Sequence, residues 1–348
     1  MSSEDIYVTY SSYFVDLSVA TLSFKLICLQ FLRSFGQWGN LIFFICSAWF
    51  LLDSKKVSLK KWFQILLEVW VISILFTLVT MFVFNKRLPL NLLMKSLLPT
   101  TFGNNWYLTC YLMFYPVHTL LNRVLDSVSQ KNYFRLAIAG FIIFFIADFV
   151  KSTLFFPSRL LLWIGVYIIV GYMKKYMHRY TDNIRANLVV FLVSVGLFLA
   201  LQIVWNIAGT RFTKMETQML RWDTNNNPFW LISSLCMLNI ARNMKFKSSI
   251  VNYISGFSML IYLIHENLLL RTYLRPYLLE YVHNVYGYEH IYLIVLVFTV
   301  VTFVASFICA IIYRNTLGRV VRAVGNSLQS LFQKRYVTVE DKLIETLN

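Results

Sequence analysis

Long apolar runs separated by short polar segments make up most of the chain. A helix needs about 20 predominantly apolar residues to cross a bilayer, and somewhat fewer at the short end. Residues 14–32 are apolar, but Asp16 and Lys25 interrupt them, which indicates an interfacial or re-entrant helix. We therefore expect an all-α fold, a polytopic transmembrane helical bundle of about nine spans, at residues 38–52, 62–84, 105–121, 133–150, 159–177, 186–207, 228–241, 250–270 and 290–313.

The composition also favours a membrane protein over a soluble one. Hydrophobic residues are 58% of the 348-residue chain and charged residues 14%, whereas soluble domains contain about 45–50% and about 25%. The cysteines are scattered through apolar runs, a pattern that predicts neither a disulfide framework nor a metal site. They are Cys28, Cys46, Cys110, Cys236 and Cys309.

The formal net charge of +16 would suggest nucleic acid in a soluble protein. Here the basic residues collect in alternate loops, with 20 of the 32 Lys and Arg in segments 53–61, 122–135, 174–185, 242–247 and 314–348. Basic loops stay in the cytoplasm and attract anionic lipids. We therefore expect a multi-pass plasma-membrane protein with a cytoplasmic C-terminus, membrane lipids as partners and no nucleic acid.

The C-terminal segment has an apolar stripe at helical spacing, which predicts an amphipathic helix on the cytoplasmic leaflet. The stripe consists of Leu317, Val320, Val321, Val324, Leu328, Leu331 and Phe332. The expected organisation is an N-terminal segment with the interfacial helix at 1–37, a transmembrane domain at 38–314 and the amphipathic tail at 315–348.

Ionisable residues inside spans are costly and therefore mark candidate functional sites. For Glu68 and Asp148 we prefer structural roles, with Glu68 paired to a lysine such as Lys61 and Asp148 reaching the headgroups. The densest cluster is Ile-Tyr-Leu-Ile-His-Glu-Asn at residues 261–267, followed by Arg271. In a continuous helix His265 and Glu266 point to different sides, so no His–Glu pair is expected there. A functional cluster and a structural Glu266–Arg271 contact both remain open.

Three segments resemble motifs of one family. Residues 36–51, G-Q-W-G-N-L-I-F-F-I-C-S-A-W-F-L, resemble the stretch G-x-x-G-V-x-x-F-x-x-I-S-G-Y-F-L. Residues 105–108, Asn-Trp-Tyr-Leu, resemble a W-[FY]-L motif, although an ordinary aromatic belt is the alternative. Residues 258–267 resemble S-x-x-I-Y-L-I-H-E-N. In this order and spacing, from about residue 24 to 314, the chain resembles the membrane acyltransferase type 3 family.

The resemblance implies an O-acyltransferase that moves an acyl group, usually acetyl from cytoplasmic acetyl-CoA, to a hydroxyl of a surface polysaccharide or its precursor. It implies no bound cofactor, with acetyl-CoA as the acyl donor and a surface glycan as the acceptor. Its candidate catalytic residues are Glu266 and His265. Substrate-binding positions are Trp106, Tyr107, Tyr262, Asn267 and Ser47, and CoA-binding positions are Lys55, Lys56, Lys60 and Lys61.

Two departures from the family pattern stand out. The Gly-Tyr pair that follows the motif serine is Ala48-Trp49 here. The first family helix, which carries an Arg and the proposed catalytic His, has no counterpart before residue 24, so we expect an N-terminally shortened chain. A tenth span would also place the N-terminus in the cytoplasm. The alternatives are an inactive truncated acyltransferase and a transporter or flippase for lipid-linked sugars, although no repeats or Gly/Pro-broken helix pairs favour the latter.

Overall fold

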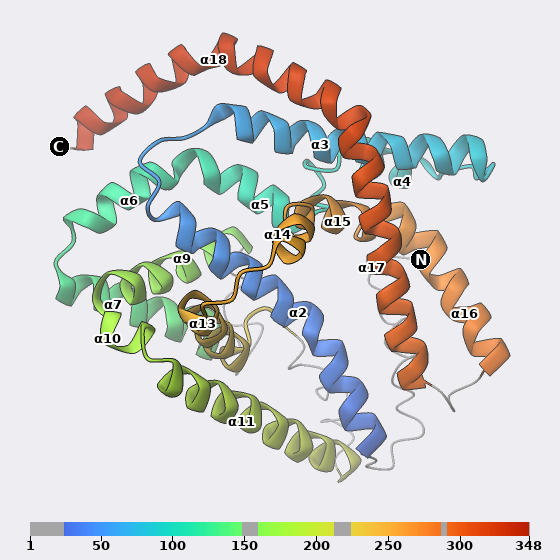
Figure 1. Ribbon diagram of the computed structural model, residues 1–348, viewed down its shortest axis with the longest axis horizontal. Helices are drawn as coiled ribbons and strands as arrows, with labels where there is room; N and C mark the ends of the chain where they lie inside the picture. Colours follow the sequence, from blue (N-terminus) through green and yellow to red (C-terminus); the bar gives the residue numbers. More distant parts are fainter. Residues whose placement is uncertain (1–23, 148–158, 212–223, 287–290, 348) are drawn as a thin grey trace. The chain divides into compact units, whose positions relative to one another are not determined.

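The computed structural model describes residues 24–147, 159–211, 224–286 and 291–347. Every regular element in these ranges is a helix (Figure 1), which confirms the predicted all-α class. The chain divides into two compact units, each built from two stretches of sequence. The first unit contains residues Met1–Lys55 and His118–Phe246, and the second contains Lys56–Val117 and Lys247–Asn348.

The first unit is organised around α2, which packs against α9 and α13. The helix α11 packs on α13, and α7 packs on α9. Large aromatic side chains, among them Phe44, Trp163, Tyr167 and Trp230, fill the interior and are fully buried. The helices are α2 (Phe24–Leu51), α6 (His118–Ser127), α7 (Gln130–Phe141), α9 (Arg159–Tyr176), α10 (His178–Thr181), α11 (Ile184–Arg211) and α13 (Pro228–Asn243), with a π-helical turn at Ile142–Ala147.

The start of α13 shows how the sequence sets these boundaries. The side-chain oxygen of Asn227 accepts hydrogen bonds from the backbone N–H groups of Phe229, at 2.9 Å, and Trp230, at 3.4 Å. Pro228 occupies the first helical position, where its missing N–H costs nothing. An N-cap followed by proline therefore begins this helix and carries Trp230 into the core.

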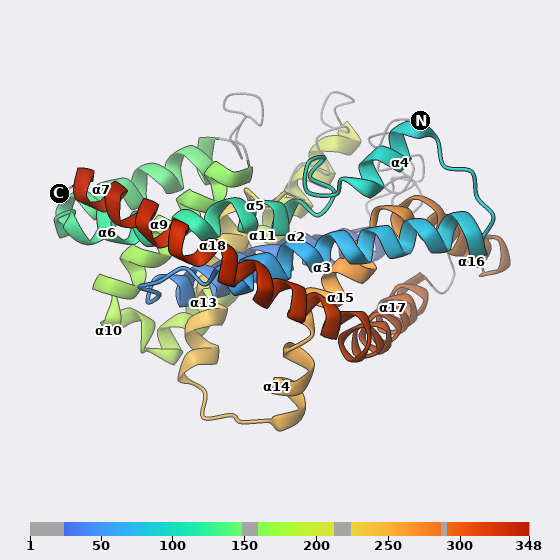
Figure 2. The same ribbon diagram turned by 90° about the horizontal axis from the view of Figure 1, so that it is seen from above.

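The second unit is organised around α3, which packs against α18 (Figures 1 and 2), while α15 packs against α17. Its helices are α3 (Leu59–Leu78), α4 (Leu90–Leu97), α5 (Trp106–Phe114), α14 (Ser249–Ser255), α15 (Ser258–His265), α16 (Arg275–Tyr286), α17 (Ile291–Asn315) and α18 (Leu317–Leu347). Shorter turns are η2 (Val79–Val83), η3 (Tyr115–Val117) and η5 (Leu270–Leu274).

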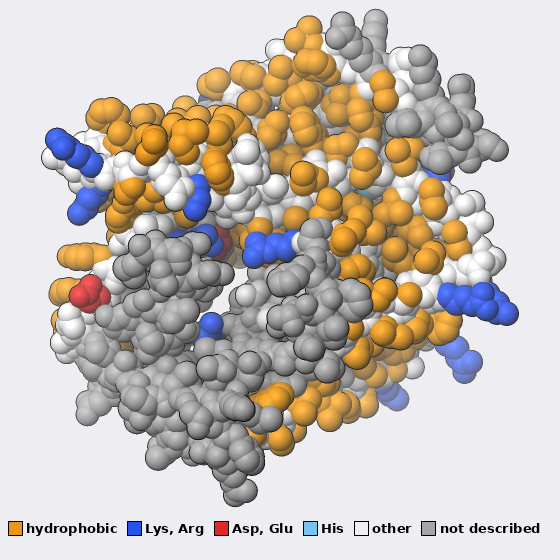
Figure 3. All heavy atoms as spheres, turned by 180° about the vertical axis from the view of Figure 1, so that it is seen from behind, with side chains coloured by type: hydrophobic (Ala, Val, Ile, Leu, Met, Phe, Trp, Pro, Cys, Tyr) orange, Lys and Arg blue, Asp and Glu red, His pale blue; other side chains and the backbone are white. Residues whose placement is uncertain are grey.

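Three helices in the described part of the chain are long and apolar enough to cross a membrane, at Leu59–Val83, Ile184–Ala208 and Leu293–Asn315. They coincide with the predicted spans 62–84, 186–207 and 290–313. Many of their apolar side chains are exposed, as at Phe82, Val204 and Leu296. Figure 3 shows hydrophobic side chains spread over much of the described surface on one face. Such a surface is typical of a protein that lies in lipid.

The prediction of nine spans is not confirmed, because several predicted spans are broken. The segment 105–121 divides at Pro116, which lacks a backbone donor, into α5, η3 and the start of α6. The segment 250–270 divides at Gly256 and again after His265. In contrast, α2 runs continuously from Phe24 to Leu51 and joins the described part of the expected interfacial segment to the first expected span. Asp148 lies outside the described residues.

The C-terminal segment forms the predicted helix as α18. On its apolar stripe Val321 is buried, whereas Val320 is 60% exposed. At Gly325 the two backbones approach closely, since a Cβ there would lie 2.9 Å from Cγ of Gln64 in α3. One side of the stripe thus packs on protein, and its placement on the cytoplasmic leaflet stays a prediction.

Candidate active site

The sequence His-Glu-Asn at residues 265–267 lies where a helix ends in the second unit. The helix α15 finishes at His265, and Glu266 is its C-cap, with φ −93° and ψ 12°. Asn267 is buried, and its side-chain oxygen accepts a hydrogen bond from the backbone N–H of Leu269 at 3.0 Å. The three polar residues therefore lie at a break between two helical segments.

The carboxylate of Glu266 lies between two arginines. Arg275 donates from Nη2 to Oε1 at 2.8 Å, and Arg271 donates from Nη1 to Oε2 at 3.2 Å. All three side chains are about one-quarter exposed, at 24–26%. The Glu266–Arg271 contact was one of the two readings of the sequence, whereas Arg275 was missed. Arg275 also donates to the backbone oxygen of His265, so it holds the break as well as the carboxylate.

The prediction that His265 and Glu266 point apart is wrong. His265 Nε2 lies 3.7 Å from Glu266 Oε1, because the helix stops between the two residues and Glu266 turns back. His265 Nδ1 lies 2.7 Å from the backbone oxygen of Ile261. A carbonyl only accepts hydrogen bonds, so this contact requires the hydrogen on Nδ1. In the neutral ring the lone pair is then on Nε2, the nitrogen that faces Glu266.

Aromatic rings extend from this histidine. The ring of Tyr262 lies edge-on to His265 and to Tyr107, with centroid separations of 6.0 Å in each case. Trp106 is edge-on to Tyr107 at 6.1 Å. The second unit thus gathers residues from the two motif segments, 105–108 and 258–267, into one cluster. We call His265, Glu266, Arg271, Arg275 and Tyr262 the His–Glu cluster.

The other predicted binding residues lie outside this cluster. Ser47 belongs to α2, and Lys55 ends the first unit. Lys56, Lys60 and Lys61 belong to the second unit and are exposed. Lys60 and Lys61 lie in the first turn of α3, where the Ser58 hydroxyl accepts from the Lys61 N–H at 3.5 Å. A helix N-terminus repels cations and attracts anions, so these lysines do not stabilise α3 and are suited to a phosphate.

Glu68 does not have the partner that we predicted. No ion pair joins it to Lys61 within the described ranges, and the cations that act on its carboxylate are Arg322 and Arg314, from α18 and α17. Among the residues that the structure describes, no group of three or more His, Cys, Asp or Glu side chains is arranged as metal ligands.

Comparison with known families tests the resemblance that the motifs suggested. A family model for an acyltransferase domain, acyltransferase 3, matches residues 6–314. The chain belongs to the acyltransferase 3 family. The match includes the motif segments 105–108 and 258–267 and all residues of the His–Glu cluster. It begins before residue 24, where the motif resemblance starts. No curated protein and no solved structure matches the sequence. Family membership and the apolar helices together make the chain a membrane acyltransferase.

Proposed function

We propose that the protein transfers acetyl from acetyl-CoA to a hydroxyl of a cell-surface polysaccharide or its precursor, as a plasma-membrane enzyme with a cytoplasmic C-terminus. The observation that carries this proposal is the geometry of His265 in an acyltransferase 3 chain. Its Nδ1 is occupied by the Ile261 carbonyl, and its Nε2 faces the carboxylate of Glu266. This arrangement suits a general base with a fixed tautomer.

The reaction assigns each group a role. Nε2 of His265 takes the proton of the acceptor hydroxyl as its oxygen attacks the thioester carbonyl. The tetrahedral intermediate then collapses with cleavage of the C–S bond, and the imidazolium returns the proton to the departing CoA sulfur. Glu266 stabilises the imidazolium between these steps through its charge, with Oε1 3.7 Å from Nε2. The Ile261 carbonyl holds Nδ1, the position that a carboxylate occupies in a Ser-His-Asp triad. Arg271 and Arg275 keep Glu266 ionised and in place, which makes it a poor proton acceptor itself.

The binding roles follow from residue chemistry. Tyr262 and Trp106 are partly exposed and offer aromatic surface on which sugar rings can pack, while the buried Tyr107 supports both rings. Asn267 is buried at the same helix break. Lys60 and Lys61 suit the phosphates of CoA because they lie in the first turn of α3, at a helix N-terminus. Lys55 and Lys56 are nearby in sequence and are proposed for the same role.

The test is acetyl transfer by membranes that contain the chain. Membranes from an expression host are incubated with acetyl-labelled acetyl-CoA and a panel of surface polysaccharides, and label is measured in the polymer and as released CoA. Label in the polymer that requires the expressed chain supports the proposal. Movement of lipid-linked sugar across the membrane without labelling would instead identify a transporter, and the absence of both activities would identify an inactive acyltransferase.

A further inference from the structure

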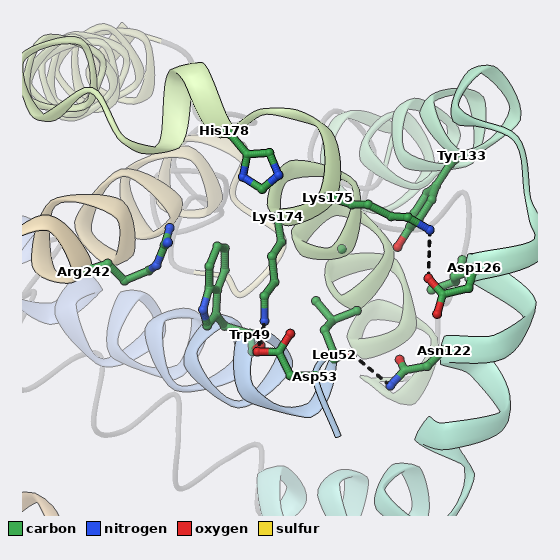
Figure 4. A pocket seen from close by; sticks show the side chains of 12 residues that line it. Trp49, Leu52, Asp53, Asn122, Asp126, Tyr133, Lys174, Lys175, His178 and Arg242 are labelled. Atoms are coloured by element: carbon green, nitrogen blue, oxygen red, sulfur yellow. Dashed lines mark hydrogen bonds and ion pairs between the residues drawn. The ribbon is translucent and has the colours of Figure 1, made fainter. Parts of the chain in front are cut away.

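The first unit contains a cavity of about 420 Å³ whose lining includes none of the residues given roles above. It lies at the C-terminal ends of α2, α9 and α13, with side chains from α6 and α7 completing it (Figure 4). Basic residues line it from distant parts of the sequence, namely Lys174, Lys175, His178 and Arg242. Its volume is within the range of small-molecule sites, about 300–1,000 Å³.

Trp49 lines this cavity and contacts two of its cations. The Arg242 guanidinium carbon lies 3.9 Å from the centroid of the indole, and Lys174 Nζ lies 4.7 Å from it. Figure 4 shows the ring standing between these two side chains. Tryptophan is the strongest aromatic partner for a cation. Trp49 occupies the position at which the family motif has tyrosine. The two cations therefore contact a residue that differs from the motif.

The lining carries more positive than negative charge. Lys174 Nζ lies 2.6 Å from Asp53 Oδ2 and also donates to the Trp49 backbone oxygen. Lys175 Nζ lies 2.8 Å from Asp126 Oδ1. Arg242 makes no ion pair in the part of the chain that the structure describes, and its only recorded partner there is the indole. An indole holds a guanidinium in position without neutralising it, so the charge of Arg242 remains available to an anion.

The position of these residues at helix ends is the competing explanation. Cations in the last turn stabilise a helix through its dipole, and Lys174, Lys175 and Arg242 are all in last turns. That explanation accounts well for Lys174, which caps α2. It does not account for a cavity, or for a guanidinium that lies on an aromatic ring instead of near carbonyl oxygens.

We propose that this cavity is a binding site for a phosphate-bearing ligand, with Arg242 as its principal contact. Two sources share that chemistry. One is the phosphorylated nucleotide end of the acyl-CoA donor, and this assignment rests on the proposed function. The other is the headgroup of an anionic phospholipid. Trp49 positions the guanidinium, and Lys175 adds positive charge around the same cavity.

The test compares two arginine variants of the whole chain, purified in a neutral detergent. Arg242→Gln removes the proposed contact, and Arg185→Gln is the matched control, since Arg185 is an exposed arginine of the first unit outside the cavity. Binding of labelled coenzyme A is measured by equilibrium dialysis, and retention of phosphatidylglycerol against phosphatidylcholine by native mass spectrometry. Thermal unfolding in the same detergent verifies that both variants are folded.

We expect Arg242→Gln to weaken the binding of one of the two ligands by at least about fivefold. Arg185→Gln should change the binding of neither ligand by as much as twofold. Weaker coenzyme A binding identifies the donor as the source, and weaker phosphatidylglycerol retention identifies the lipid. If Arg242→Gln binds both ligands as the unmodified chain does, the site does not exist. That result does not bear on the acetyl-transfer assay in membranes. If instead the unmodified chain transfers no acetyl group, the proposed function is refuted, but the measured binding to the cavity is unaffected.

Discussion

The His–Glu cluster of the second unit and the Trp49 cavity of the first unit hold pairs of cations in opposite ways. In the first case a carboxylate lies between two arginines, at 2.8 and 3.2 Å. In the second an indole lies between Arg242 and Lys174. The carboxylate compensates charge and fixes geometry through directed hydrogen bonds. The indole fixes position but leaves the charge intact.

This difference separates a site that orients its own side chains from a site that attracts a ligand. Arg271 and Arg275 are engaged by Glu266 and have little left for an external anion. Arg242 has no carboxylate partner in the described ranges, so an anion can approach it. Each site contains two cations. Whether they can bind an external anion depends on whether a carboxylate or an indole lies between them.

The largest effect should come from the histidine. We expect His265→Gln to lower acetyl transfer by at least about 100-fold, because it removes the proposed general base. Transfer is measured in membranes normalised to the amount of folded protein, and coenzyme A binding should stay within twofold. Transfer within threefold of the unmodified chain would exclude His265 as the base and would weaken the distinction between the two regions.

Removing the charge between the arginines comes next. Glu266→Gln should lower transfer by at least about tenfold, roughly 1.4 kcal/mol of barrier, since the imidazolium loses its counter-charge. Glu280→Gln is the control, because Glu280 is an exposed glutamate of α16. If the amount of folded protein falls with the activity, the ion pairs are structural and Glu266 has no role of its own in the reaction.

The two arginines should not be equivalent. Arg275 contacts both Glu266 and the His265 backbone oxygen, whereas Arg271 makes one longer contact. We expect Arg275→Gln to lower the free energy of unfolding by about 1 kcal/mol more than Arg271→Gln, since it loses one more charge-assisted hydrogen bond. Unfolding by titration with a denaturing detergent measures the difference. Equal losses would mean that the helix break is held by other contacts.

Substitutions at Trp49 can remove the aromatic ring or replace it with a smaller one. Trp49→Leu should weaken binding of the phosphate-bearing ligand by at least about threefold, whereas Trp49→Tyr should keep most of the affinity, since tyrosine still attracts cations. Equilibrium dialysis or native mass spectrometry, whichever detects the ligand, compares the two. Equal affinities in both variants would show that the ring does not position Arg242.

The smallest effect should come from an exposed ion pair. Asp126→Asn removes the partner of Lys175, and the side chain of Asp126 is 72% exposed and that of Lys175 39% exposed. The free energy of unfolding should change by less than about 1 kcal/mol. The affinity for the phosphate-bearing ligand should rise, by roughly twofold at low salt, because a negative charge leaves the cavity lining. Weaker binding would show that Asp126 itself contacts the ligand.

The sequence predicted the helical class and three of the spans, but it made no prediction that the 105–108 and 258–267 motifs meet. It failed where helices end. A contact between Glu266 and Arg271 was one of the two alternatives that the sequence left open. Arg275 was not considered, and the π-helical turn η5 changes the register of the backbone before this residue. The Trp49 cavity needs the ends of three helices, at residues 51, 176 and 243, and no local sequence pattern predicts that these ends meet.

The packing of α18 on α3 has a consequence for the order in which the protein is made. The ribosome produces residues 59–78 long before residues 317–347, and at about 5–20 residues per second the interval is roughly tens of seconds. Throughout that interval the side of α3 around Gln64, against which Gly325 later lies, has no helix to cover it. The nascent second unit therefore depends on lipid, the translocation machinery or a chaperone to shield this side until the last helix emerges.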